Sequence, residues 1–358
     1  MCALPTQPAS TTRSRARRAS AGARVALALL AVPSSVHAFE LKPPIALREA
    51  AWPTFVSKVN RVVLNHPVVT SNAYTKWFAR GVATDAEARD LTIQFSVFSN
   101  LFLEAQLAKI INAGSLEEMR EGKEILANEL GVVFNNKHHR VARAREPSAL
   151  ADGLDHELVS TEGSIEGGVF HFKAGHYEWL LDVGARLGVG FDAMGKRKHG
   201  CASTLHFCDA LRVIYGSEHA DTALAASFAV ENWAAAGFWD ELVEGWKGFN
   251  ANREQRVPVG FWTHHAALEA QHADHTLDEL KEVYLAGRVC DEDKFVADCG
   301  EMLDAVKVFW DGLDARRLGS APPAPSKDYS VGGLGYKGDT PFGGPVGGAQ
   351  RTAEQRQL

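Results

Sequence analysis

Apolar residues recur every three to four positions through most of the chain, which is the spacing of amphipathic helices. Strand-like alternation is confined to 168–173. Thr84-Asp85 has the composition of a helix start, and Ser115-Leu-Glu-Glu118 has the form of a capping box. The pattern therefore predicts an all-α protein with about eight to ten helices. The expected helices cover 46–66, 70–82, 84–111, 115–130, 176–187, 203–214, 221–246, 261–286 and 291–313.

Three stretches fall outside this helical pattern and divide the chain. Residues 132–175 are irregular, with Gly, Asp, Ser and scattered charge, and we interpret them as a long inserted loop. From Ser320 onward the chain is rich in Pro and Gly, which is typical of a disordered tail. The expected organisation is a cleavable presequence over 1–38, a helical domain over 39–318 with the insertion at about 132–175, and a disordered tail over 319–358.

The first 38 residues have the composition of a targeting segment. They contain five arginines, many Ser, Thr and Ala residues and no acidic residue, followed by the apolar run Val25–Val32 and a small residue at Ala38. The apolar run is far shorter than the roughly 20 residues that span a bilayer, so we expect no stable membrane span. The acid-free segment resembles a chloroplast transit peptide. Arg17-Arg18 resembles a twin-arginine signal, so the two together would direct the protein to the thylakoid lumen. The alternative is a secreted or periplasmic protein.

Charge and cysteine spacing exclude two classes of site. The chain has a net charge of −6, and removal of the five arginines would leave the mature protein at about −11. Such an acidic protein is not expected to bind nucleic acid. Cys201, Cys208, Cys290 and Cys299 have no C-x-x-C spacing, which argues against a zinc site. Pairing of Cys290 with Cys299 and free thiols at both positions remain alternatives.

The expected helix over 261–286 carries the main candidate chemistry. His265, Glu269 and His272 are spaced i, i+4 and i+7, so they stand on one stripe of the helix. Two imidazoles and a carboxylate on one stripe suit a divalent transition metal. The alternative is a solvated, His-rich polar face, which is how we interpret His264 and His275.

Three glutamates in apolar surroundings favour the metal interpretation. Glu104, Glu129 and Glu231 each stand in a largely apolar helical stretch, where a charge is costly unless it is paired or metal-bound. A further histidine ligand could be His139 or His176. Ferritin-like centres carry two E-x-x-H motifs, and only Glu269-Ala-Gln-His272 has that form here. A ferritin-like centre is therefore disfavoured.

Together these residues resemble the haem-oxygenase-like di-iron oxidases and oxygenases, also described as iron-containing redox enzymes. This family is related in fold to thiaminase-type and coenzyme-PQQ-synthesis proteins. The late H-x3-[DE]-x2-H helix of the family matches His265, Glu269 and His272, and the likeness covers roughly 45–315. The sequence after His176 resembles the family's helix better than the sequence after His139 does, so the resemblance implies His176 as the ligand. The implied metal ligands are Glu104, Glu129, His176, Glu231, His265, Glu269 and His272.

The resemblance implies a helical core that holds two Fe ions, with a Mn/Fe pair as the variant, and O2 as co-substrate. It implies an oxidoreductase that acts on a small-molecule substrate such as an amino acid, a fatty acid or an amine. The reaction would be C–C cleavage, desaturation or N-oxygenation, with no catalytic residue beyond the metal ligands. An external electron donor and a homodimer are compatible with it. The competing interpretation is a metal-free, thiaminase-like or small-molecule-binding protein of the same fold, which would need a nucleophilic cysteine for catalysis.

Overall fold

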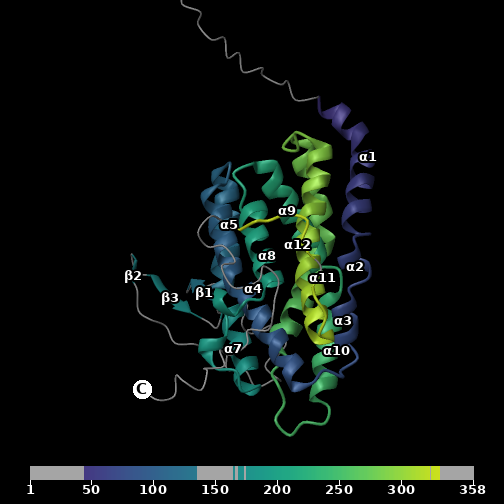
Figure 1. Ribbon diagram of the computed structural model, residues 1–358. Helices are drawn as coiled ribbons and strands as arrows, with labels where there is room; N and C mark the ends of the chain where they lie inside the picture. Colours follow the sequence, from purple (N-terminus) through teal and green to yellow (C-terminus); the bar gives the residue numbers. More distant parts are fainter. Residues whose placement is uncertain (1–43, 135–163, 166–167, 173–174, 323, 331–358) are drawn as a thin grey trace, which may run out of the picture. The chain divides into compact units, whose positions relative to one another are not determined.

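The computed structural model describes residues 44–134, 164–165, 168–172, 175–322 and 324–330, which lie in one compact unit that begins at Pro43. This part of the chain is predominantly helical, so the predicted all-α character is confirmed (Figure 1). Its main helices are α1 (Ile45–Val63), α2 (Pro67–Thr70), α3 (Ala73–Phe78), α4 (Asp85–Ile111), α5 (Leu116–Glu129), α7 (His176–Arg186), α8 (Ala202–Ala210), α9 (Ala220–Ala234), α10 (Phe238–Asn250), α11 (Gly260–Leu285) and α12 (Glu292–Leu318). Short 3-10 turns cover Phe191–Ala193 and Arg197–His199.

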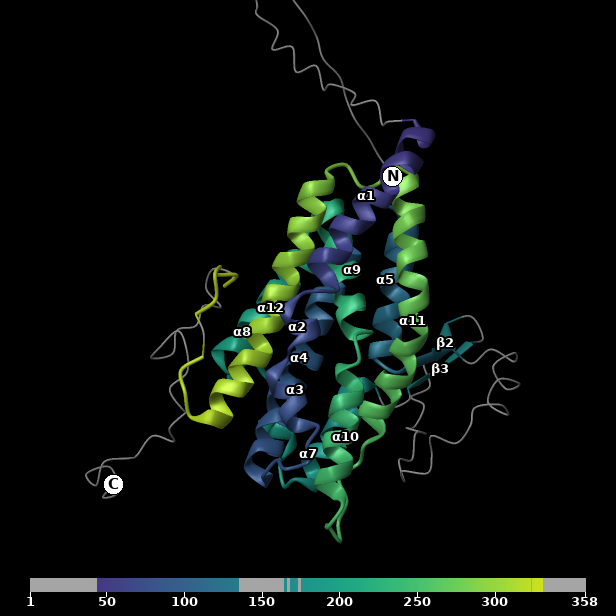
Figure 2. The same cartoon turned by 90° about the vertical axis from the view of Figure 1, so that its right-hand side faces the viewer.

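Helix α12 packs against helices from both halves of the chain, including α1, α3, α8 and α9. Helix α9 also contacts α11, so it lies between α11 and α12, as Figure 2 shows. Large aromatic side chains fill the space between these helices, and Phe95, Phe309 and Trp310 are almost completely buried there. Burial of each such ring stabilises the fold by about 1.5–3 kcal/mol relative to leaving it exposed.

The two predicted capped helix starts are confirmed. The Thr84 hydroxyl accepts a hydrogen bond from the Glu87 amide at 3.3 Å, and the Glu87 carboxylate accepts one from the Thr84 amide at 2.7 Å. The Ser115 hydroxyl also caps α5, because it accepts a hydrogen bond from the Glu118 amide at 3.2 Å. The predicted capping box is incomplete, because the Glu118 carboxylate accepts from the amide of Gly114 and not from that of Ser115.

Two predicted helices differ from the expectation. The helix expected over 221–246 is α9 followed by α10, and Gly237 between them has a φ of 86°. A positive φ lies outside the right-handed helical region and is readily adopted only by glycine. The helix is therefore interrupted at Gly237. The helix expected over 203–214 is continuous, but its last part is a π-helix, η4 (Leu211–Tyr215).

The predicted irregular stretch over 132–175 contains strands where it is described. Strand β1 (Val132–Phe134) pairs antiparallel with β3 (Gly168–Phe172), and β2 (Ser164–Ile165) pairs with the other edge of β3. The alternation over 168–173 therefore does correspond to a strand. The prediction of an irregular insertion is wrong for β1 and β2, because their backbone groups pair with those of β3.

No helix in the described part of the chain combines the length and apolar composition that crossing a bilayer requires. The proposed cleavage site at Ala38 and most of the expected tail lie outside the described residues.

Candidate metal centre

The small sheet brings two predicted ligands together. Val132 and Phe172 are partners in the β1–β3 pairing, so the chain that leaves the end of α5 returns to it. Gly175 then packs against the last turn of α5, where an added Cβ would lie only 2.6 Å from the carbonyl oxygen of Glu129. As a result, Glu129 at the end of α5 and His176 at the start of α7 are neighbours.

The contact between these two side chains has the spacing of two ligands of one ion. His176 Nδ1 lies 3.1 Å from Glu129 Oε2, and both side chains are largely buried. Nevertheless, the Nδ1 atom has no hydrogen-bond partner among the described residues. Two atoms that each lie about 2.0–2.2 Å from a metal ion are about 3 Å apart. The spacing of the pair is compatible with a shared metal ion as well as with an ion pair.

His265 on α11 is the third member of this group. Its ring centroid lies 4.7 Å from that of His176, and its ring stacks on Trp239 at 4.6 Å. Burial, and to a smaller degree the neighbouring His176, lowers the pKa of His265 to about 3, so its imidazole is neutral at physiological pH. Its Nδ1 lies 2.6 Å from the carbonyl oxygen of Phe261. Donation of the Nδ1 proton to that oxygen leaves the lone pair on Nε2, which is how histidine ligands are commonly oriented.

Glu104 and Glu231 stand at the same height along the helices as each other. Contacts along α12 show that α9 runs parallel to it and that α4 runs antiparallel to it. Lys109 on α4 lies 2.9 Å from Ser227 on α9. Helices α4 and α9 are therefore antiparallel to each other. Glu104 lies five residues before Lys109 on α4, and Glu231 lies four residues after Ser227 on α9. Both glutamates are thus displaced from the Lys109–Ser227 contact in the same direction along the bundle, by about one helical turn.

The surroundings of Glu104 differ from the sequence expectation. Its apolar context predicted an inward side chain, but Glu104 is exposed, and so are Leu107 and Ile111 on the same stripe of α4. Helix α4 carries apolar residues on its exposed side as well as on its buried side. The apolar neighbours of Glu104 in the sequence therefore do not indicate whether its side chain is buried. Glu231 is half-buried. The role of both glutamates as ligands stays a prediction.

The remaining predicted ligands are described only by their backbone or not at all. Helix α11 runs without interruption from Gly260 to Leu285, so positions 265, 269 and 272 do share one helix. The side chains of Glu269 and His272, and the whole of His139, lie outside the described residues. Among the side chains that are described, no three His, Cys, Asp or Glu residues are close enough to hold a metal ion. Glu129 contacts His176, and the ring of His176 contacts the ring of His265, so the three are linked by two pairwise contacts and do not surround a single point.

Sequence reasoning missed the residues that hold this group in place. Gly175 permits the close approach of α7 to α5, and its only signal is a glycine directly before the histidine. His264 is exposed, as predicted, but its ring also contacts Trp179 at 4.9 Å and His176 at 5.6 Å. His264 therefore lies beside both His176 and Trp179.

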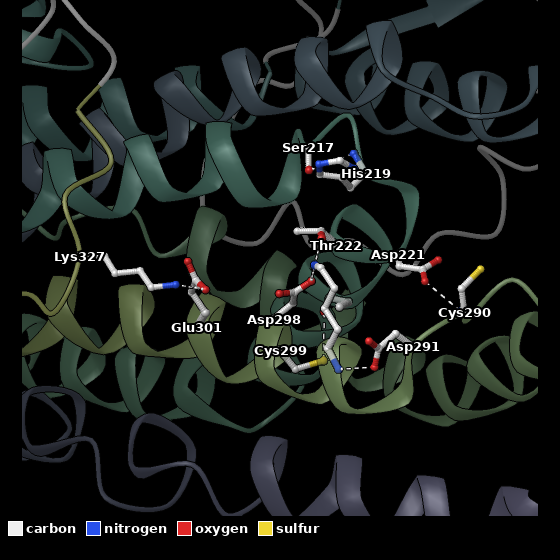
Figure 3. Close-up of polar contacts among 12 residues, drawn as sticks. Ser217, His219, Asp221, Thr222, Cys290, Asp291, Asp298, Cys299, Glu301 and Lys327 are labelled. Atoms are coloured by element: carbon white, nitrogen blue, oxygen red, sulfur yellow. Dashed lines mark hydrogen bonds and ion pairs between the residues drawn. The ribbon is translucent and has the colours of Figure 1, made fainter. Parts of the chain in front are cut away.

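The cysteines do not support the metal-free, nucleophilic alternative. Burial, with a smaller contribution from Asp209, raises the pKa of the Cys208 thiol, which keeps it protonated. The Cys201 sulfur contacts the hydroxyls of Ser203 and Thr204 at 3.2 Å. Cys290 and Cys299 do not form a disulfide bond with each other in the structure. Figure 3 shows Cys290 beside Asp221, whereas Cys299 is buried and its sulfur lies 3.3 Å from the carbonyl oxygen of Ala225.

Comparison of the chain with models of known protein families and with curated proteins finds no match. The functional assignment therefore depends on the residues of the candidate centre.

Proposed function

We propose that the protein is a non-haem di-iron oxidase or oxygenase that uses O2 to oxidise a small organic substrate, on a haem-oxygenase-like helical bundle. The observation that carries the proposal is the group formed by Glu129, His176 and His265, in which an orphaned Nδ1 faces a carboxylate oxygen at 3.1 Å. The proposed ligands are this group together with Glu104, Glu231, Glu269 and His272. An iron pair bound there would supply the electrons that reduce O2.

The described residues prepare such a centre in three ways. The neutral imidazole of His265 offers its Nε2 lone pair without first losing a proton. The carboxylate of Glu129 supplies negative charge that offsets the charge of a bound cation. The rings of Trp239 and Phe261 pack against His265 and limit the access of water.

The expected partners are a small-molecule substrate and an external electron donor. A haem-binding relative would use a single proximal histidine and would leave Glu129 beside His176 without a role. The metal-free alternative lacks an activated thiol at Cys208. Both alternatives therefore explain fewer of the described contacts than the di-iron proposal.

Metal analysis of the purified protein tests the proposal. We expect about two iron ions per chain after anaerobic reconstitution, with a ferrous spectrum that changes on exposure to O2. Glu231→Gln should lower the iron content and abolish O2 consumption, because it removes a charged ligand. Metal-free Glu231→Gln and metal-free wild type should melt at similar temperatures. A wild-type chain that binds no iron would contradict the proposal, and a Glu231→Gln protein with normal iron and O2 uptake would remove Glu231 from the centre.

We also propose that the mature protein resides in the chloroplast, in the thylakoid lumen. The motive is the acid-free, arginine-containing segment that ends in Ser-Val-His-Ala38. We expect N-terminal sequencing of the native protein to begin near Phe39. A native protein that begins at Met1 or Cys2 would contradict this assignment.

A further inference from the structure

A row of tryptophan rings leads away from the candidate metal centre. Trp239 on α10 stacks on His265, with ring centroids 4.6 Å apart. Trp262 on α11 lies 6.2 Å from Trp239 and 5.7 Å from Trp246, which follows Trp239 about two turns later on α10. All three indole rings are buried. The row therefore follows the contact between α10 and α11, from His265 to Trp246.

From Trp246 the row continues to the surface at Trp77 on α3. The ring of Phe78 bridges the two indoles, with its centroid 5.2 Å from that of Trp246 and 6.0 Å from that of Trp77. Gly245 permits this contact, because an added Cβ would lie 2.5 Å from the carbonyl oxygen of Phe78. Trp77 is half-buried, and the guanidinium carbon of Arg317 lies 4.4 Å from the centroid of its ring. The row thus joins the candidate metal centre to the protein surface.

Packing alone does not explain why the buried rings of the row are indoles. The Nε1 atoms of Trp239, Trp246 and Trp262 are buried, and none has a hydrogen-bond acceptor among the described residues. A buried tryptophan usually bonds its N–H to an acceptor, and leaving that group unpaired destabilises the fold. Phenylalanine would fill much of the same space without a polar atom. Three successive unpaired indoles therefore point to a property that phenylalanine lacks, and a redox role is one established reason for such groups.

The property that indole has and phenylalanine lacks is ready oxidation by one electron. Loss of an electron converts tryptophan into a radical cation, whose N–H proton normally passes to a nearby base. The Nε1 atoms of Trp239, Trp246 and Trp262 have no such acceptor among the described residues. Each oxidised ring therefore keeps its proton, and the neighbouring ring can re-reduce it by electron transfer alone. The short centroid separations of 5.7 and 6.2 Å between these rings suit that transfer.

We propose that Trp239, Trp262, Trp246 and Trp77 form a one-electron relay that returns electrons to the oxidised centre when no substrate is bound. This inference rests on the proposed function, since the oxidant is the iron centre after reaction with O2. Trp239 gives one electron to the centre and is re-reduced by Trp262. Trp246 then re-reduces Trp262, and Trp77 re-reduces Trp246. A one-electron reductant of the ascorbate or thiol class finally reduces Trp77 at the surface, and any proton that it releases goes to solvent. The sum is one electron transferred from the reductant to the centre, while the three buried rings keep their N–H protons.

Oxidation of Trp77 in the substrate-free, iron-loaded, full-length protein tests the relay. After exposure to O2 without a reductant, we expect peptide mass spectrometry to find oxygen added to Trp77, and we expect ascorbate to prevent this product. Trp310 and Tyr74 offer a second row between the same ends, joined to Trp239 by Phe238. The main interruption is therefore Trp239→Phe, at the ring where both rows begin. This variant should lose most of the Trp77 product at unchanged iron content.

Trp52→Phe is the matched control, because Trp52 is a tryptophan of α1 whose described ring contacts all lie outside the row. It should leave the Trp77 product unchanged. Should Trp239→Phe not fold, Trp262→Phe interrupts the first row and should lower the yield of the same product.

A photo-oxidant tests the relay independently of iron. A ruthenium polypyridyl complex is attached beside the candidate centre, through the thiol of His264→Cys, in metal-free protein whose Cys2 and exposed Cys290 are replaced with serine. Illumination in the presence of an electron acceptor should oxidise Trp77 in this protein, and Trp239→Phe should lose most of that oxidation.

A row that only packs the core would lower the melting temperature of Trp239→Phe without changing the oxidation of Trp77. The relay is overturned if Trp77 stays intact in iron-loaded wild type that consumes O2, or if folded Trp239→Phe keeps the full Trp77 product. Normal iron content and O2 consumption with intact Trp77 leave the proposed function standing. A chain that binds no iron rejects the proposed function instead. In that protein, photo-oxidation of Trp77 that depends on Trp239 supports the row as an electron path, and its absence overturns it.

Discussion

Replacement of His176 with alanine is expected to reduce the iron content from about two ions per chain to about one or fewer. His176 Nδ1 lies 3.1 Å from Glu129 Oε2, so the substitution removes one member of the closest described pair of candidate ligands. The carboxylate of Glu129 would remain, but the cation would have one ligand fewer and would therefore bind more weakly. The measurement is iron per chain after anaerobic reconstitution, together with the melting temperature with and without iron.

His139→Ala is the matched control for this experiment. His139 is the other histidine that the sequence offered as a ligand after Glu129, and it lies outside the described residues. We expect His139→Ala to bind iron as the wild type does. The reverse pattern, with iron lost in His139→Ala and kept in His176→Ala, would show that His139 is the ligand and that the contact between Glu129 and His176 is structural.

Local features of the sequence were sufficient to predict most helices. The Thr84 and Ser115 caps depend on side chains within three residues of each other, so they could be read directly from the chain. The stripe formed by positions 265, 269 and 272 needed only a continuous helix, and α11 is continuous over all of them.

The differences arise where long-range packing decides the conformation. The alanine-rich run through Gly237 has helical spacing on both sides, and nothing local indicates the break that separates α9 from α10. The π-helix that ends at Tyr215 could not be predicted from the sequence either, because a π-helix differs from an α-helix in its hydrogen-bond pattern and not in its composition. Glu104 shows that apolar neighbours do not guarantee burial, since Leu107 beside it is also exposed.

The contact between Glu129 and His176 could be predicted only through the family resemblance. Composition of the stretch between them predicted an irregular loop, which gives no reason for its two ends to meet. The structure provides the reason in the pairing of Val132 with Phe172 and in the small size of Gly175. The structure thus places beside Glu129 the histidine that the resemblance implies, and the choice between His176 and His139 as the ligand stays a prediction.

Gly175→Ala is therefore expected to weaken iron binding by about tenfold or more without touching any proposed ligand. The φ of Gly175 is −70°, so alanine can adopt the backbone conformation, and the effect is steric. Its Cβ would lie 2.6 Å from the carbonyl oxygen of Glu129, so α7 must move away from α5. That movement widens the 3.1 Å gap between His176 Nδ1 and Glu129 Oε2, and overpacking of this kind costs about 1–3 kcal/mol of stability.

Gly190→Ala is the matched control, because Gly190 has a similar φ of −76° and no atom within 4 Å of an added Cβ. We expect Gly190→Ala to leave both iron affinity and melting temperature unchanged. Iron affinity and the free energy of unfolding of the metal-free protein, measured for both variants, separate the two effects. If Gly175→Ala lowers stability but binds iron with wild-type affinity, the α5–α7 junction stabilises the fold and does not position a metal ligand. If it lowers affinity by more than the loss of stability accounts for, the close approach at Gly175 determines the spacing of Glu129 and His176 in the centre.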